Sequence, residues 1–232
     1  MSICIIVGHG KSKNGGYDSG AVNGNYHEFK IAKEIAKECV DYLNATYDID
    51  ADLMNYDGSL YLTDRIKKVN ANNYDFIAEI HLNAGGGTGT EVFYYHGSPT
   101  SKKYAEAISK SIADTFGITN RGAKVRLNSN GKDYFAIIRD TKPTAVLVET
   151  VFIDTASDLA KVKTADGQKK CGVAIAEAIA SVKGLKKVAV AKPTTKKMYR
   201  VCAGAYSDYN NAVEMKNKLI KAGFKDTYIV EV

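Results

Sequence analysis

Four side chains that could bind and use a metal ion lie at the ends of apolar segments or at the start of one. His9 follows the apolar run 3–7, and His81 ends a similar run that begins at residue 76. Glu28 opens a stretch with helical apolar spacing, and Glu149 ends the run TAVLVE. Two histidines and one glutamate form a known catalytic zinc set that leaves a fourth position for water. A further glutamate can then serve as general base for that water.

The stretch GHGKS at residues 8–12 invites a different interpretation, a phosphate-binding loop. That motif needs a glycine five residues before the glycine of its Gly-Lys-Ser end, and Ile5 stands there instead. It also needs a helix directly after the serine, whereas residues 13–20 are polar and glycine-rich. The sequence therefore favours His9 as a residue at a strand end over a nucleotide site.

The elements that must position these residues alternate between strand-like and helix-like patterns. This alternation predicts an α/β fold, a twisted and mainly parallel sheet flanked by helices. Strands are expected at residues 3–7, 76–82, 91–95 and 145–152, and helices at 28–44, 62–70, 101–116 and 168–182. Because open α/β sheets place their sites at the carboxyl ends of strands, His9, His81 and Glu149 should share one edge.

The expected helix at 28–44 brings Glu28 to the same region. A step of about 100° per residue places Glu28 on the apolar face of this helix. An inward carboxylate needs a partner, because burying an unpaired charge is costly. An acid in the first turn also serves simply as a partner for the helix dipole, and this alternative stays open.

Length and composition are those of a soluble globular protein with 232 residues, 45% hydrophobic and 25% charged. No run approaches the roughly 18 apolar residues of a membrane span, and the first residues lack the features of a signal peptide. We therefore expect no membrane partner and no export signal. The formal charge of +6 suits any polyanion, including nucleic acid or an anionic cell wall. The four separated cysteines, 4, 39, 171 and 202, are expected to be buried thiols.

The pattern of elements stops near residue 183, which divides the chain into three expected parts. Residues 1–182 form the main domain, and the lysine-rich stretch 183–197 has the composition of a solvated linker. Residues 198–232 are expected to form a small βαβ module, with a strand and turn from 198, a helix at 210–222 and a strand at 227–232.

The sequence over about residues 3–182 resembles the zinc-dependent N-acetylmuramoyl-L-alanine amidases of the amidase-3 type. The matching motifs, in the family's order, are IVGHG, DSGAVNGNYHE, IHLNA, NRGAK and LVETVF. Carried over by position, the resemblance implies that His9, Glu28 and His81 bind Zn²⁺ and that Glu149 is the catalytic acid and base. It implies peptidoglycan as substrate, and no nucleic acid. Glu79 departs from the family pattern, either as an extra carboxylate near the metal or as a residue that orients a ligand.

Residues 198–232 resemble half of a sporulation-related repeat, a module that binds peptidoglycan glycan strands. A half-module leaves strand edges unpaired, so we expect a homodimer through this segment, or alternatively docking onto the main domain. With no export signal expected, the resemblance favours a phage or prophage endolysin made in the host cytoplasm and acting on the wall after release. The alternatives are a bacterial autolysin of cell separation or sporulation, a zinc peptidase of related fold, and a wall-binding protein with structural zinc.

Overall fold

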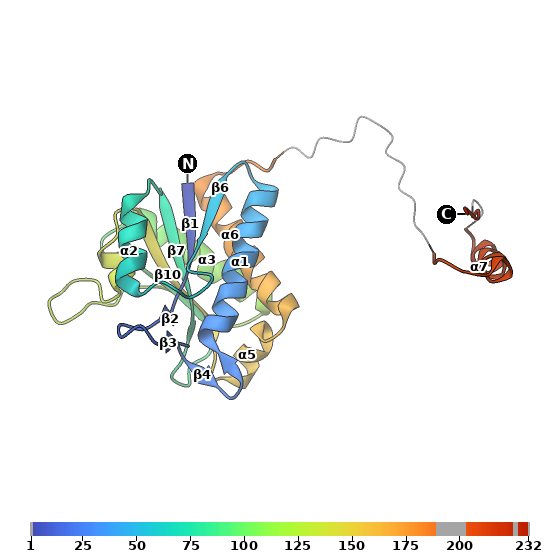
Figure 1. The fold of residues 1–232 in the computed structure, drawn as a ribbon. Helices are drawn as coiled ribbons and strands as arrows, with labels where there is room; N and C mark the ends of the chain where they lie inside the picture. Colours follow the sequence, from blue (N-terminus) through green and yellow to red (C-terminus); the bar gives the residue numbers. More distant parts are fainter. Residues whose placement is uncertain (1, 189–202, 225–226, 232) are drawn as a thin grey trace. The chain divides into compact units, whose positions relative to one another are not determined.

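The computed structural model describes residues 2–188, 203–224 and 227–231. The chain divides into two compact units, Met1–Val188 and Ala189–Val232, and each is described by itself. In the first unit, a sheet lies between layers of helices (Figure 1). Among the described residues, none of the helices combines the length and the apolarity that a membrane crossing requires.

The sheet of the first unit has six strands in the order β6-β1-β7-β10-β8-β9. Neighbours among β6, β1, β7 and β10 run parallel, β8 runs antiparallel to β10, and β9 runs parallel to β8. The expected α/β fold with a mainly parallel sheet is therefore confirmed. The strand bounds are β1 (Ser2–Val7), β6 (Asp50–Met54), β7 (Phe76–Asn83), β8 (Thr90–Tyr94), β9 (Asn120–Lys124) and β10 (Thr144–Phe152).

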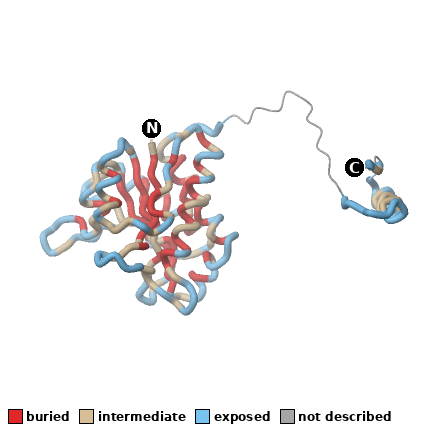
Figure 2. Tube along the Cα trace, in the orientation of Figure 1, coloured by how far each residue is buried: buried red, intermediate tan, exposed pale blue. Residues whose placement is uncertain are grey.

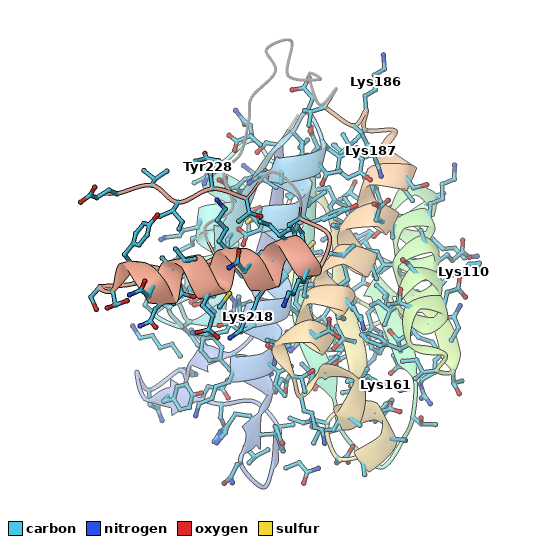
Figure 3. All side chains as sticks on the ribbon, turned by 90° about the vertical axis from the view of Figure 1, so that its right-hand side faces the viewer. Lys110, Lys161, Lys186, Lys187, Lys218 and Tyr228 are labelled. Carbon is cyan, nitrogen blue, oxygen red and sulfur yellow. The ribbon has the colours of Figure 1, made fainter. Side chains whose placement is uncertain are left out.

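Helices cover both faces of this sheet. Three long helices, α1 (Glu28–Thr46), α3 (Pro99–Phe116) and α6 (Ala165–Lys183), share one apolar core with the sheet, and α5 (Ala156–Val162) contacts α6 and β10. On the opposite face, α2 (Leu62–Ala71) and the short α4 (Ala136–Arg139) share a second core. Figure 2 shows the buried strands between these layers. Figure 3 looks onto the three-helix side, where Lys110 and Lys186 project away from the helices.

Burial on both faces explains why the central strands were recognisable in the sequence. Ile3, Ile5 and Val7 of β1 belong to one core, whereas Cys4 and Ile6 belong to the other. Strands buried on both sides therefore appear as continuous apolar runs. The expected buried thiols are confirmed for cysteines 4, 39 and 171, and Cys202 lies outside the described residues.

Two small hairpins lead from β1 to α1. The first pairs β2 (Gly10–Lys11) with β3 (Tyr17–Asp18), within the stretch expected to be a loop, and the second pairs β4 (Val22–Asn23) with β5 (Tyr26–His27). Together they return the chain to the edge of the sheet at which β1 ends. The chain then enters α1 at Glu28, next to His9 in space.

The second unit contains helix α7 (Tyr209–Lys221), which corresponds to the helix expected at 210–222. Asp208 caps it by accepting hydrogen bonds from the backbone N–H groups of Asn210 and Asn211. The strand expected at 227–232 is wrong for residues 227–231, which form no strand, and residues 198–202 of the other strand lie outside the described residues. Helix α7 has no buried residue, so it offers no core against which a two-stranded sheet could be stabilised.

Candidate active site

Three potential ligand atoms converge at the carboxyl edge of the parallel strands. Glu28 Oε1 lies 3.1 Å from His9 Nε2 and 2.9 Å from His81 Nδ1. One potential ligand atom from each of the three residues falls within 4.8 Å of the others. Around zinc with bonds of about 2.0–2.1 Å, tetrahedral ligand atoms stand about 3.3 Å apart. The two distances to Glu28 are close to this spacing, and the structure thus brings together the three residues expected from the sequence as a group that could hold one metal ion.

Glu28 is the centre of this group, and the backbone holds both of its carboxylate oxygens. Oε2 accepts a hydrogen bond from the N–H of Ala21 at 2.8 Å, and Oε1 accepts one from the N–H of Leu82 at 3.1 Å. Burial by itself raises the pKa of Glu28, but hydrogen bonds from His81 and His9 outweigh burial and hold the pKa well below its ordinary value. The first-turn acid is therefore an ionised, buried carboxylate at the centre of the cluster.

Gly20 lets the chain pass close to this carboxylate. Its φ is +64°, in the left-handed region that favours glycine. A Cβ atom at this position would lie 2.5 Å from Glu28 Oε2 and 2.8 Å from His9 Cδ2. Any larger residue would have to displace one of the two candidate ligands.

Each histidine of the group is held by a second carboxylate through its other ring nitrogen. His9 Nδ1 lies 2.9 Å from Asp18 Oδ2, and His81 Nε2 lies 3.2 Å from Glu79 Oε2. Carboxylate partners of this kind fix the ring orientation of metal-binding histidines. Sequence analysis missed the role of Asp18, although this residue opens the DSGA stretch of the matching motif.

The electrostatics of the group favour positive charge at its centre. Burial lowers the pKa of His81, but hydrogen bonds to Glu28 and Glu79 raise it well above its ordinary value. Burial also lowers the pKa of His9, but the hydrogen bond to Glu28, its main acidic partner, leaves the pKa of His9 above its ordinary value. The acidic groups therefore stabilise whatever cation occupies this centre, proton or metal. The other two histidines of the chain, His27 and His96, are not part of the group.

Glu149 lies beside the group on the neighbouring strand. Its backbone is in register with His81 on β7 and with Glu91 on β8. Its Oε2 is shielded from solvent and has no hydrogen-bond partner among the described residues. Burial raises the pKa of Glu149 to about 7, with the negative charges of Glu28 and Glu91 adding to the rise and His81 opposing it. A carboxyl group that titrates near neutrality is suited to accept and return a proton.

A His–Glu–His group beside a separate carboxyl group of raised pKa is suited to metal-assisted hydrolysis. The chain belongs to the N-acetylmuramoyl-L-alanine amidase family, because the Amidase_3 family model matches residues 3–181. As a member of this family, it is a peptidoglycan amidase.

Known relatives agree with this assignment. The chain is 28% identical over 235 residues to the sporulation-specific N-acetylmuramoyl-L-alanine amidase of Bacillus subtilis (strain 168), covering 100% of this chain and 85% of the relative. It is 32% identical over 183 residues to the endolysin of Bacillus phage SPP1, covering 75% of this chain and 65% of the relative. Among solved structures, Cwp6 from Clostridium difficile matches with a TM-score of 0.72 and 34% identity over 78% of this chain. The chain spans only 29% of the length of that Cwp6 chain.

Proposed function

We propose that this chain is a zinc-dependent amidase that hydrolyses the amide between N-acetylmuramic acid and L-alanine in peptidoglycan. His9, Glu28 and His81 bind the zinc ion, and Glu149 is the catalytic acid and base. The observation that carries this proposal is the convergence of two imidazole nitrogens and one carboxylate oxygen beside a carboxyl group of raised pKa.

The residues present fit zinc in three respects. Imidazole nitrogen and carboxylate oxygen are ligand types that zinc accepts, and three protein ligands leave one coordination position open. The second nitrogen of each histidine already has a carboxylate partner, Asp18 for His9 and Glu79 for His81. When bound, zinc supplies Lewis-acid polarisation of the scissile carbonyl and of the attacking water.

Glu149 carries the proton in this reaction. As a carboxylate it removes a proton from the attacking water, and as a carboxylic acid it gives that proton to the departing alanine nitrogen. The amide carbon–nitrogen bond breaks, which leaves a carboxylate on the lactyl group and a free amino terminus on the peptide. Burial raises the pKa of Glu149 in the metal-free protein, and a raised pKa makes the carboxylate a stronger base for this exchange.

Mass spectrometry of digested peptidoglycan tests the bond that is cut. The expected products are stem peptides with a free L-alanine amino terminus, and glycan strands that retain their lactyl carboxylate. Cleavage within the stem peptide would instead support a zinc peptidase. Removing metal with a chelator should abolish the release and added zinc should restore it, so unchanged release by metal-free protein would eliminate the zinc mechanism.

The biological role that we propose is that of a phage or prophage endolysin, made in the host cytoplasm and acting on the wall after release. The similarity to the endolysin of Bacillus phage SPP1 supports this role. A sporulation role is the second candidate, because the sporulation-specific relative aligns with the whole of this chain. Purified protein that clears vegetative cell walls would support the endolysin, and activity confined to spore walls would support the second candidate.

For the C-terminal part, we propose a sporulation-related half-module at residues 198–232 that binds glycan strands and pairs with a second copy, joined to the amidase domain by residues 183–197. The exposed apolar side chains of this unit support a partner, since Tyr209 is 72% exposed and Phe224 is 63% exposed. Light scattering on the whole chain should give a dimer, and a chain ending near Lys183 should give a monomer. A dimer that survives the truncation, or a monomer in both cases, would contradict this part of the proposal.

A further inference from the structure

A buried ion pair lies next to the candidate zinc site, and one of its members, Glu79, is the carboxylate partner of His81 described above. Arg65 of α2 and Glu79 of β7 place Nε and Oε1 3.0 Å apart, with only 5% and 3% of their side chains exposed. Removing two charges from water costs free energy that their mutual attraction often fails to recover. Stability alone is therefore a weak reason for this pair.

The pair contacts both histidines of the site. Glu79 uses its second oxygen, Oε2, to hold His81 Nε2 at 3.2 Å. Arg65 donates a hydrogen bond from Nη1 to the backbone carbonyl of His9 at 2.8 Å. One end of the pair thus orients a side chain, and the other end holds the backbone of a second candidate ligand.

The backbone of His9 needs such support. Its φ is +62°, a left-handed conformation that is uncommon for residues other than glycine and persists only where the surroundings hold it. The buried Asn55 donates a second hydrogen bond to the same carbonyl at 2.9 Å, and a further one to the carbonyl of Val7 at 2.8 Å. Arg65 and Asn55 together determine where the chain turns after β1, and hence where the imidazole of His9 points.

The contacts also show on which side of His81 the carboxylate of Glu79 lies. The ring nitrogen that faces Glu28 is Nδ1, whereas the nitrogen that faces Glu79 is Nε2. The imidazole ring therefore stands between Glu79 and the point where the three ligand atoms converge. This geometry favours an orienting role for Glu79 over a role as an extra metal ligand.

We propose that Arg65 and Glu79 are positioning residues which, as one buried ion pair, set the side chain of His81 and the backbone of His9 for zinc. This inference rests on the zinc site of the proposed function. It requires that the pair affects zinc affinity even when its loss leaves the fold intact. Removing only one of the two charges is a poor test of this effect on zinc affinity, because the remaining buried charge destabilises the protein.

The main test is therefore the double variant Arg65→Met/Glu79→Met, with zinc affinity measured by competition with a chromophoric chelator. Because both charges leave together, the variant should fold, which circular dichroism and thermal unfolding can verify. Its zinc affinity should fall by about 10- to 100-fold, as is usual when a residue that orients a metal ligand is lost. The single variant Glu79→Gln should also weaken zinc binding. Its amide has only one oxygen, so it cannot both accept a hydrogen bond from His81 and pair with Arg65 as the two carboxylate oxygens do.

Glu177→Gln is the matched control, because Glu177 also accepts from buried or half-buried neighbours, Tyr42 and Tyr47, but lies away from the site on α6. Its zinc affinity should equal that of the unmodified protein. NMR of the zinc-loaded protein gives a second readout: the Nε2–H of His81 should show a downfield, slowly exchanging signal that Glu79→Gln shifts or removes.

The outcomes separate the two proposals. If the unmodified protein binds no zinc, the proposed metal site is wrong. If it binds zinc and the folded double variant binds it equally well, the metal site stands and the positioning role is overturned. If the double variant does not fold, the decision falls to Glu79→Gln and the NMR signal, and unchanged affinity with an unchanged signal overturns the role as well.

Discussion

Ionisation of Glu149 destabilises the folded state, and the free energy of this destabilisation can be measured in the metal-free protein. Burial raises the pKa of Glu149 from its ordinary value of 4.5 to about 7. Below pH 4.5 the carboxyl group is protonated in both the folded and the unfolded chain, so it does not change the free energy of unfolding. As the pH rises, the unfolded chain loses this proton first, so the folded state loses stability until the pH has passed about 7.

The change Glu149→Gln removes this titration and keeps the shape of the side chain. Each tenfold change in an ionisation equilibrium corresponds to about 1.4 kcal/mol, so the full penalty on the unmodified protein is about 3 kcal/mol. Between pH 5 and pH 8, the stability of Glu149→Gln relative to the unmodified protein should therefore increase by about 2–3 kcal/mol. The sign of this stability difference is the most informative result, because the catalytically impaired variant Glu149→Gln should be more stable than the unmodified protein at high pH.

Urea unfolding at several pH values in the presence of a chelator measures this difference. Metal must be absent, since a nearby cation would stabilise the carboxylate and hide the effect. Glu106→Gln is the control, because Glu106 is an exposed carboxylate on α3 with 55% of its side chain accessible. Its stability relative to the unmodified protein should change by less than about 0.5 kcal/mol over the same pH range. A Glu149→Gln difference that is equally independent of pH would refute the claim that burial disfavours the charged carboxylate.

Three further variants test the surroundings of the site. Gly20→Ala should lower peptidoglycan release and zinc affinity at least tenfold by displacing Glu28, and wild-type values for both would contradict the close approach seen here. Asp18→Asn should weaken zinc binding by about 10- to 100-fold, measured by chelator competition, because His9 loses its carboxylate partner. Glu91→Gln removes a negative charge that raises the pKa of Glu149, so the acidic limb of the kcat/KM profile should move to lower pH; a shift to higher pH would exclude this coupling.

The sequence predicted the central strands and long helices because their apolar patterns are complete. Within the six-stranded sheet, the two strands that it failed to predict, β6 and β9, are the edge strands. Their sequences, DADLM and NRGAK, are polar because an edge strand is only partly covered. The alternation of apolar and polar residues along these strands is then too weak to distinguish them from loops. The missed elements therefore lie at the periphery, and the strands that carry the candidate site were found.

Site residues were predictable where a metal-binding or proton-transferring residue type stood at the end of a predicted strand or at the start of a predicted helix. The structure brings His9, Glu28 and His81 together as expected, and places Glu149 in register with His81. Arg65 was missed because arginine on a surface helix is ordinarily exposed. A signal was nevertheless present, since Arg65 falls among Leu62, Ile66 and Val69 at helical spacing, on the face that the structure buries. An arginine within an apolar stripe indicates a buried partner, and in this chain that partner is Glu79.

Departures from local rules are concentrated at the same sheet edge. His9 has a left-handed backbone, Glu28 and Glu79 are buried carboxylates, and Glu149 has a shielded oxygen without a hydrogen-bond partner among the described residues. Elsewhere in the first unit, the apolar patterns, the strand pairing and the burial of side chains agree with one another. Natural proteins tolerate such conflicts mainly where function requires them. The two well-packed cores therefore supply the stability that lets this edge hold several carboxylates close together, and those carboxylates make the edge a place for a cation.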